Sequence, residues 1–316
     1  MTRFDGSITD VKGITVGQAQ DKHAKTGVTV VLAGKEGAVL GVDVRGAAPG
    51  TRETDLAKPG NLVKRANAVV LSGGSAFGLA SADGVMRYLE SINYGLDMGV
   101  CHVPIVPAAV LFDLGVGDAH TWPDAIMGEQ ACKNTSKNVC EGSVGAGCGA
   151  TIAKLVPNSI PCKGGVGTAS IKLSNGITVG AIAAVNAVGD VYHPHSSELV
   201  ACGSLPDGKK VSAMDLLYGN IPSVDLPKIS GAGQNTTIAV IACDAKLTKE
   251  QASRLATVAH DGIARTIIPA HTQMDGDTIF SLATGRVDCD YNFIQICMAA
   301  SEVMARAIYN AAIAEK

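Results

Sequence analysis

The sequence predicts a mixed α and β fold in which two sheets are covered by helices, and three observations indicate it. Hydrophobic residues make up 47% of the chain and charged residues 17%, below the roughly 25% charged residues of an ordinary soluble domain. Glycine turns separate β-rich runs, which is typical of antiparallel hairpins. Long stretches with helical apolar spacing occur in the same chain. Layers of sheet and helix would bury this much apolar sequence.

Four β-rich segments are predicted to pair as two hairpins. The second hairpin contains Asn-Gly, the strongest short-range signal for such a turn. The segments are Thr26–Leu32 and Ala38–Val44, joined across Gly34–Gly37, and Thr168–Leu173 and Ile177–Val185, joined across Ser174–Gly176.

Three long helices are predicted from apolar spacing and capping signals. The first covers Ala76–Ser91. The second opens at Thr248, which with Gln251 forms a capping box, and runs to about Arg265. The third runs from about Tyr291 to Ile313 and is apolar on nearly every turn, so we expect it to be buried.

A long surface connection is predicted over Pro194–Gln234. This segment is rich in Gly, Pro, Ser and Asp and has weak periodicity. It ends at Asn235, and the continuous apolar run Thr237–Cys243 then indicates a buried strand.

The overall charge argues against two classes of partner. The net charge is −3, and the chain has no long Lys or Arg run, so we expect neither a nucleic acid nor a membrane surface as partner. The first residues lack a basic stretch followed by an apolar one, and no apolar run reaches the roughly 18 residues of a membrane span. These features predict a cytoplasmic protein.

The cysteines and histidines do not suggest a metal or cofactor site. The nine cysteines are scattered without a Cys-x-x-Cys pair, which is typical of reduced, mostly buried thiols. His193, His195 and the pair Cys101-His102 lack further ligands at metal-site spacing. The Gly-rich stretches lack the pattern of a dinucleotide site. We therefore expect no metal and no cofactor.

The junction Asn235-Thr236 is the first candidate for chemistry. A threonine hydroxyl is a weak nucleophile unless a base activates it, and a free α-amine on the same residue can be that base. The pKa of an α-amine, near 8, suits this task. Cleavage before Thr236 would create such an amine. The local sequence alone favours the simpler interpretation that Thr236 opens a strand, where threonine is common.

Asp275 and Asp277 form a second candidate cluster. Two carboxylates two residues apart lie on one face of an extended segment. They could orient a hydroxyl or an amine, and one could hold the other protonated. Taken alone, the Asp-Gly sequence also fits a solvated turn.

Asn186 and Lys154 are isolated polar residues in apolar surroundings. Asn186 lies in a predicted strand and could donate to an oxyanion, although a strand-end turn before Gly189 explains it equally well. Lys154 follows Thr151-Ile152-Ala153 in a predicted strand. It could be a buried charge partner, but an exposed position on an edge strand is the simpler local interpretation.

Taken in order along the chain, these segments resemble the L-aminopeptidase/D-esterase family of the DmpA type, which includes the nylon-oligomer hydrolases. The resemblance covers nearly the whole chain. It rests on Ile8–Gly17, Val44–Glu53, Leu71–Leu79, Val144–Gly147, Val185–Asp190, Asn235–Thr237 and Ala259–Arg265.

The resemblance implies an α+β fold, a four-layer αββα sandwich like that of N-terminal-nucleophile hydrolases. It implies a single domain, residues 1–316, that cuts itself into 1–235 and 236–316, with the two pieces staying together in a tetramer. Thr236 matches the nucleophile, Asn186 the oxyanion asparagine, and Lys154 a lysine near the site. A threonine nucleophile followed by Asp275 and Asp277 is similar to the nylon-oligomer hydrolase branch.

One residue departs from the family pattern. The family has a tyrosine that binds the reacting carbonyl where this chain has Phe112, which lacks a hydroxyl. The contact is then missing or supplied by backbone N–H groups.

The implied function is an autoprocessing amidohydrolase with an N-terminal threonine nucleophile. The predicted activity is endo-hydrolysis of 6-aminohexanoate (nylon) oligomers or similar oligoamides. One alternative is an aminopeptidase/D-esterase that releases N-terminal residues from short peptides. Another, from a different class, is a metabolite-binding protein that keeps the fold without the reaction.

Overall fold

A computed structural model describes residues 2–221 and 235–315, and their strands form two main sheets that pack face to face. The β2 sheet has the order β1-β2-β6-β9-β4, and the β18 sheet has the order β12-β13-β18-β20-β3-β5. The strands of the β2 sheet are β1 (Thr15–Asp21), β2 (Thr26–Leu32), β6 (Ala68–Ser72), β9 (Ala108–Val110) and β4 (Gly50–Arg52). Those of the β18 sheet are β12 (Gly165–Lys172), β13 (Thr178–Asn186), β18 (Thr236–Ala245), β20 (Thr278–Val287), β3 (Ala38–Val44) and β5 (Arg65–Ala66).

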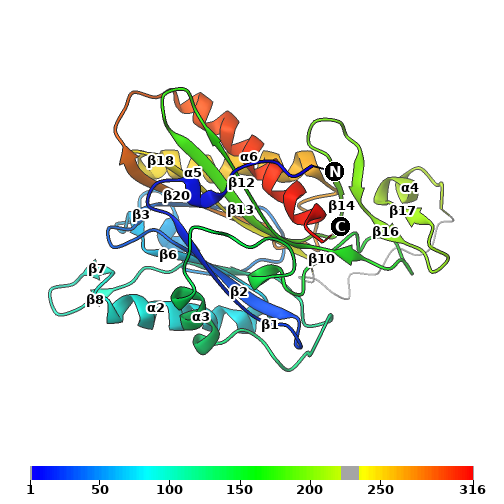
Figure 1. The fold of residues 1–316 in the computed structure, drawn as a ribbon, viewed down its shortest axis with the longest axis horizontal. Helices are drawn as coiled ribbons and strands as arrows, with labels where there is room; N and C mark the ends of the chain where they lie inside the picture. The colour runs from blue at the N-terminus through cyan, green and yellow to red at the C-terminus, as the bar shows by residue number, and fades with distance from the viewer. Residues whose placement is uncertain (1, 222–234, 316) are drawn as a thin grey trace.

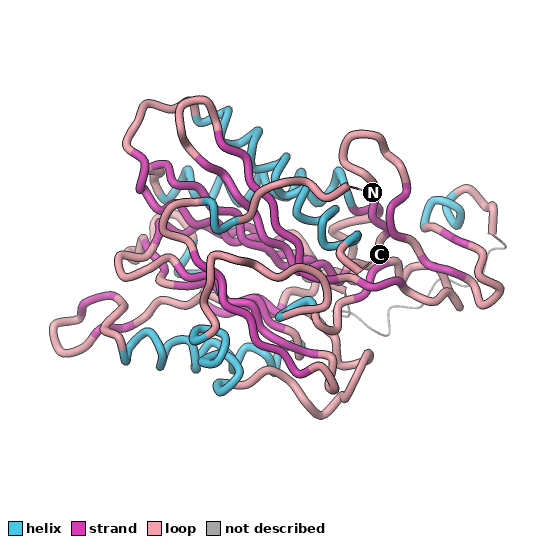
Figure 2. Tube along the Cα trace, viewed as in Figure 1, coloured by secondary structure: helices cyan, strands magenta, loops and turns pink. Residues whose placement is uncertain are grey.

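Helices cover the outer face of each sheet, so the molecule has four layers (Figure 1). Helices α5 (Lys249–Thr266) and α6 (Phe293–Ile313) pack on the β18 sheet. Helices α2 (Ser81–Ser91) and α3 (Ala125–Lys133) pack on the β2 sheet. Figure 2 shows the strands of both sheets between these helices. The predicted αββα sandwich is confirmed.

Three apolar clusters hold the four layers together. One joins the β18 sheet to α5 and α6, and it includes Ile241 and Val303. The second lies between the two sheets around Phe280 and Leu71. The third lies between the β2 sheet and α2 and α3. Burial on both faces explains why β18 is buried at every position.

The remaining elements are short. They are three 3₁₀ helices, η1 (Ile8–Asp10), η2 (Ser75–Ala80) and η3 (Gly145–Gly147); helices α1 (Thr54–Ala57) and α4 (Ala213–Leu217); and strands β7 (Leu96–Asp97), β8 (His102–Val103), β10 (Thr151–Ile152), β11 (Cys162–Lys163), β14 (Asp190–Tyr192), β15 (Leu199–Ala201), β16 (Gly203–Ser204), β17 (Lys210–Val211) and β19 (Ile267–Ile268), as counted over the described residues.

The first predicted hairpin is wrong, whereas the second is confirmed. β12 and β13 pair antiparallel across the Asn-Gly turn. β2 instead pairs with β1 and β6, and β3 pairs with β20 and β5. The turn at Gly34–Gly37 therefore passes the chain from one sheet to the other. Both strands are apolar enough to pack between layers, and local sequence does not distinguish a hairpin from a sheet-to-sheet crossover.

The helix predictions are close to the structure. Thr248 caps α5 through the predicted box with Gln251, and α6 begins two residues later than expected. The first predicted helix divides into η2 and α2. Part of the predicted long connection, residues 222–234, lies outside the described residues.

Two further expectations are tested by the fold. All nine cysteines lie in the described residues as free thiols, and only four of them are buried, so the expectation of mostly buried thiols is wrong. Within the described residues, no helix combines the length and the apolar character that crossing a membrane requires.

Candidate active site

The direction of the strands brings three of the predicted site residues to one edge of the β18 sheet. β18 and β20 are parallel, so Thr236, the first residue of β18, lies at the same edge as Asp277, which directly precedes β20. β13 is antiparallel to β18, so its last residue, Asn186, pairs with Thr236. The sheet topology, and not proximity in sequence, therefore gathers these side chains.

The Asn235-Thr236 peptide is buried and its carbonyl oxygen accepts two hydrogen bonds. Both residues are 2% exposed. The Thr236 hydroxyl donates to the Asn235 carbonyl oxygen, and the backbone N–H of Gly276 donates to the same oxygen at 2.9 Å. The hydroxyl thus lies beside the carbonyl group that it would attack, and an N–H group points at the oxygen where charge would develop.

Asp277 connects the start of β18 to a histidine. Its Oδ1 accepts from the backbone N–H of Thr237 at 2.7 Å. Its Oδ2 accepts from Nδ1 of His271 at 2.7 Å and from the His271 backbone N–H at 3.2 Å. The carboxylate is 2% exposed, and a buried charge is costly unless it is hydrogen bonded in this way.

Asp275 is held by a turn and is harder to ionise. Its Oδ2 accepts from the backbone N–H of Thr272 at 2.9 Å and from the Thr272 hydroxyl at 2.6 Å. Burial, followed by the charge of Asp277, raises the pKa of Asp275, while the Thr272 hydrogen bonds and the Lys154 ammonium oppose the rise. At 2% exposure, neither aspartate belongs to a solvated turn.

Lys154 and Asn186 form the other side of the site. Nζ of Lys154 donates to Oδ1 of Asn186 at 2.9 Å and to its backbone carbonyl at 3.0 Å. Burial lowers the pKa of Lys154 to about 7, and the Asp275 carboxylate opposes this. Nδ2 of Asn186 donates to the carbonyl oxygen of Phe112 at 3.0 Å, and its Oδ1 accepts from the Thr151 N–H at 3.0 Å.

The prediction that Lys154 lies in a strand is wrong. β10 ends at Ile152, and the backbone N–H groups of Ala153 and Lys154 bond to the carbonyl oxygens of Gly189 and Val188. These bonds, formed with the turn after β13, bring Lys154 to Asn186. Ala153 has a φ of 67°, a left-handed conformation that is rare for a residue with a side chain and that the sequence does not announce.

A small cavity opens beside Lys154. Its volume is about 360 Å³, and the described residues that line it include no acidic side chain. They are Phe112, Gly115, Val116, Thr151, Lys154 and Pro161. The cavity is therefore apolar apart from one hydroxyl and one amine, and it borders the residues that bond to Asn186.

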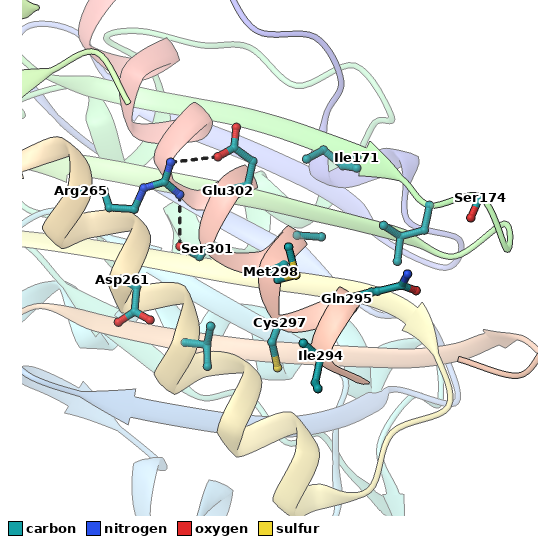
Figure 3. Close-up of a pocket in the computed structure, with 13 residues that line it drawn as sticks. Ile171, Ser174, Asp261, Arg265, Ile294, Gln295, Cys297, Met298, Ser301 and Glu302 are labelled. Carbon is teal, nitrogen blue, oxygen red and sulfur yellow. Dashed lines mark hydrogen bonds and ion pairs between the residues drawn. The ribbon is translucent and has the colours of Figure 1, made fainter. Parts of the chain in front are cut away.

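A larger cavity lies elsewhere. It has a volume of about 690 Å³ and runs between α5 and α6, lined by Ile294, Met298 and the Arg265–Glu302 ion pair among others (Figure 3). None of the predicted site residues lines it. The predicted site residues therefore lie at the edge of the β18 sheet, away from this groove.

Sequence reasoning missed two groups at the site. Nothing in the sequence indicates that the side chain of His271, six residues before Asp277, binds that carboxylate. The Gly276 N–H lies between two candidate aspartates, yet only the bridge between Asn235 and Asp275 aims it at the Asn235 carbonyl. Within the described residues, no cluster of His, Cys, Asp and Glu could hold a metal ion.

Gly276→Ala is expected to slow any reaction at Thr236. A Cβ at this position would lie 2.9 Å from the Thr236 hydroxyl oxygen and 2.7 Å from the Ala48 carbonyl oxygen. Overpacking of about 1–3 kcal/mol beside the Thr236 hydroxyl corresponds to a rate reduction of roughly 10- to 100-fold. The rate of fragment formation, followed by denaturing electrophoresis, measures the effect. An unchanged rate would mean that Gly276 does not border the reacting hydroxyl.

Comparison with known proteins places this geometry in context. The chain matches peptidase family S58 over residues 6–316. An uncharacterized aminopeptidase of Mycobacterium tuberculosis is 48% identical over 296 residues, covering 89% of this chain and 82% of the relative. A 6-aminohexanoate-oligomer endohydrolase of Kocuria sp. is 28% identical over 318 residues, covering 96% and 85%.

Solved structures share the fold. A β-aminopeptidase of Burkholderia sp. superimposes with a TM-score of 0.70 at 23% identity, covering 99% of this chain and 88% of the other. An L-aminopeptidase D-Ala-esterase/amidase of Ochrobactrum anthropi, described as a variant of the Ntn hydrolase fold, gives 0.70 at 20% identity, covering 99% and 87%. At these low sequence identities, the likeness to the two solved structures shows the fold alone.

Proposed function

Because the chain belongs to peptidase family S58 and is an amide-bond hydrolase, we propose that it cuts itself between Asn235 and Thr236 and then uses Thr236 as an N-terminal nucleophile. The observation that carries the proposal is the buried carbonyl of Asn235. Its oxygen receives both the Thr236 hydroxyl and the Gly276 N–H. A surface threonine that merely opens a strand would not have this arrangement.

The proposed self-cleavage has two steps. The Thr236 hydroxyl oxygen attacks the Asn235 carbonyl carbon, and the acyl group moves from nitrogen to oxygen to give an ester. Water then hydrolyses the ester, which restores the hydroxyl and leaves Thr236 with a free α-amine. The Gly276 N–H stabilises the oxyanion formed in the first step.

In the mature enzyme, the freed amine takes the hydroxyl proton as Thr236 attacks a substrate amide. Asn186 stabilises the oxyanion through Nδ2. Asp277 fixes the start of β18 through the Thr237 N–H, and Lys154 and Asp275 set the charge around the amine. Water finally releases the acyl group from Thr236.

Mass spectrometry of the purified protein tests the first step. We expect two polypeptides, residues 1–235 and 236–316, with Thr236 as the amino terminus of the smaller one. An intact chain of 32.2 kDa after long incubation at neutral pH would contradict the proposal and favour a binding protein on the same fold. The tetramer implied by the resemblance stays a prediction.

For the substrate, we propose oligoamides cut at interior bonds. An aminopeptidase must pair the ammonium of its substrate with a carboxylate. The described residues that line the cavity beside Lys154 include no acid, and Asp275 and Asp277 are both engaged by neighbouring groups. The relative from Kocuria, whose name describes an endohydrolase of 6-aminohexanoate oligomers, supports the same class.

A second candidate is an aminopeptidase acting on short peptides. The more similar relative from Mycobacterium tuberculosis carries that name. In that case an acidic residue outside the cavity would bind the substrate ammonium.

A matched pair of substrates separates the two candidates. We expect the mature enzyme to cleave a 6-aminohexanoate oligomer with a free amino end and its acetylated form at comparable rates, at interior bonds, because no ammonium contact is needed. Chromatography of the products shows which bonds are cut. Cleavage of the free-amine form alone, one unit at a time, would assign the aminopeptidase function.

A further inference from the structure

His271 is a polar residue near the proposed nucleophile that has no role in the mechanism described so far. It lies in the segment between β19 and β20 with a φ of 57°. This left-handed conformation is uncommon for residues other than glycine, although asparagine, aspartate and histidine adopt it more often than the rest. The histidine side chain is 19% exposed. Such a backbone persists only where surrounding contacts maintain it, and the contacts present here lead to the active site.

Both donors of His271 converge on one oxygen. Nδ1 lies 2.7 Å and the backbone N–H lies 3.2 Å from Oδ2 of Asp277. The other oxygen of Asp277 accepts from the Thr237 N–H at 2.7 Å. Asp277 is therefore a bridge with His271 at one end and the residue next to the proposed nucleophile at the other.

A second histidine limits how the His271 ring can turn. The His260 ring, from the buried face of α5, packs edge-on against it with 4.9 Å between ring centroids. His260 bonds through Nε2 to the Asp43 carbonyl at 3.1 Å. Burial lowers the pKa of His260 to about 4, so it is neutral at neutral pH and does not compete as a cation for Asp277.

We infer that His271 is a positioning residue that fixes the Asp277 carboxylate, and through it the start of β18 and the Thr236 hydroxyl. Nδ1 carries the proton that is donated to Asp277. In many sites a carboxylate orients a histidine through such a bond; here the histidine orients the carboxylate. The inference rests on the proposed function, because it needs Thr236 to react.

The left-handed backbone at position 271 suggests the test variants. Glycine and asparagine both tolerate a φ of 57°, so His271→Gly and His271→Asn should keep the local fold. Glycine removes the Nδ1 donor, whereas the asparagine amide Nδ2 can replace it. The two variants therefore differ in the hydrogen bond to Asp277 more than in backbone strain.

We expect His271→Gly to slow self-cleavage, and to lower the kcat of the cleaved enzyme, by roughly 10- to 100-fold. This is the range for losing a hydrogen bond to a charged group. KM should change little, because His271 does not line the cavity beside Lys154. His271→Asn should recover most of the rate, and added imidazole should partly rescue His271→Gly because the histidine side chain is partly exposed.

His195→Gly is the matched control. His195 likewise bonds to a carboxylate, that of Glu302, at 2.6 Å, and a left-handed residue, Ser197 at φ 56°, follows two positions later. It contacts Phe4 and His193 instead of the proposed site. We expect wild-type rates. The thermal unfolding midpoint of each variant reports whether it is folded.

Two results would overturn the inference. One is a His271→Gly protein with wild-type rates of self-cleavage and hydrolysis. The other is an equal loss of these rates in folded His271→Asn and His271→Gly, with no rescue by imidazole. Thr236→Ala, measured alongside, separates the two ideas. If Thr236→Ala is inert while His271→Gly is normal, only the role of His271 fails, whereas an active Thr236→Ala removes the proposed function itself.

Discussion

Thr236→Ala is expected to remain a single chain of 32.2 kDa and to lose hydrolytic activity altogether. The substitution removes the only oxygen of this side chain that can attack the Asn235 carbonyl, while the backbone N–H of Gly276 and the pairing of β18 with β13 and β20 are kept. Mass spectrometry and a hydrolysis assay measure the two losses.

Two variants of the same strand act as controls for Thr236→Ala. Thr236→Ser keeps the hydroxyl and should still cleave. Thr237→Val keeps the β-branched shape and the backbone N–H that Asp277 accepts, so it should cleave like the wild type. A Thr236→Ala protein that cleaves without host protease would show that this threonine is not the nucleophile.

Asn186→Ala is expected to lower kcat by roughly 10²- to 10³-fold in the cleaved enzyme, the usual effect of removing one oxyanion donor. Asn186 pairs directly with Thr236 in the register of β13 and β18. Steady-state kinetics on the cleaved fraction measure the change, and KM should be affected less than kcat.

Asn186 also has a structural role, because it binds Lys154 and Thr151. A second variant separates this role from oxyanion stabilisation. Its Oδ1 accepts from Lys154 and from the Thr151 N–H. Asn186→Asp keeps an acceptor for both but loses the Nδ2 donor. If the donor matters, both variants lose activity. A nearly active Asn186→Asp beside an inactive Asn186→Ala would make the asparagine an anchor for Lys154.

The family resemblance already identified most residues of the site. Thr236, Asn186, Asp275, Asp277 and Lys154 occupy matching positions in the chain, and the structure gathers them in one region. The local patterns alone did not, because a threonine opening a strand or an Asp-Gly pair is common in any protein. Their roles stay predictions until the variants are measured.

The sequence by itself determined the elements whose signals are local. The capping box at Thr248, the Asn-Gly turn between β12 and β13 and the apolar run of β18 each depend on a few neighbouring residues. The high apolar content also predicted the layered packing, because helices and sheets with this many apolar faces must cover one another.

Only the tertiary structure decided which strands pair and where the donors of the site point. The crossover of β2 and β3 into different sheets, the left-handed backbone at Ala153 and the bond from His271 to Asp277 depend on contacts between segments far apart or on turns without a sequence signal. The parallel pairing of β18 with β20 also depends on contacts between segments far apart in the chain. Such pairings are set by the balance of packing over whole layers, and single residues carry little information about them.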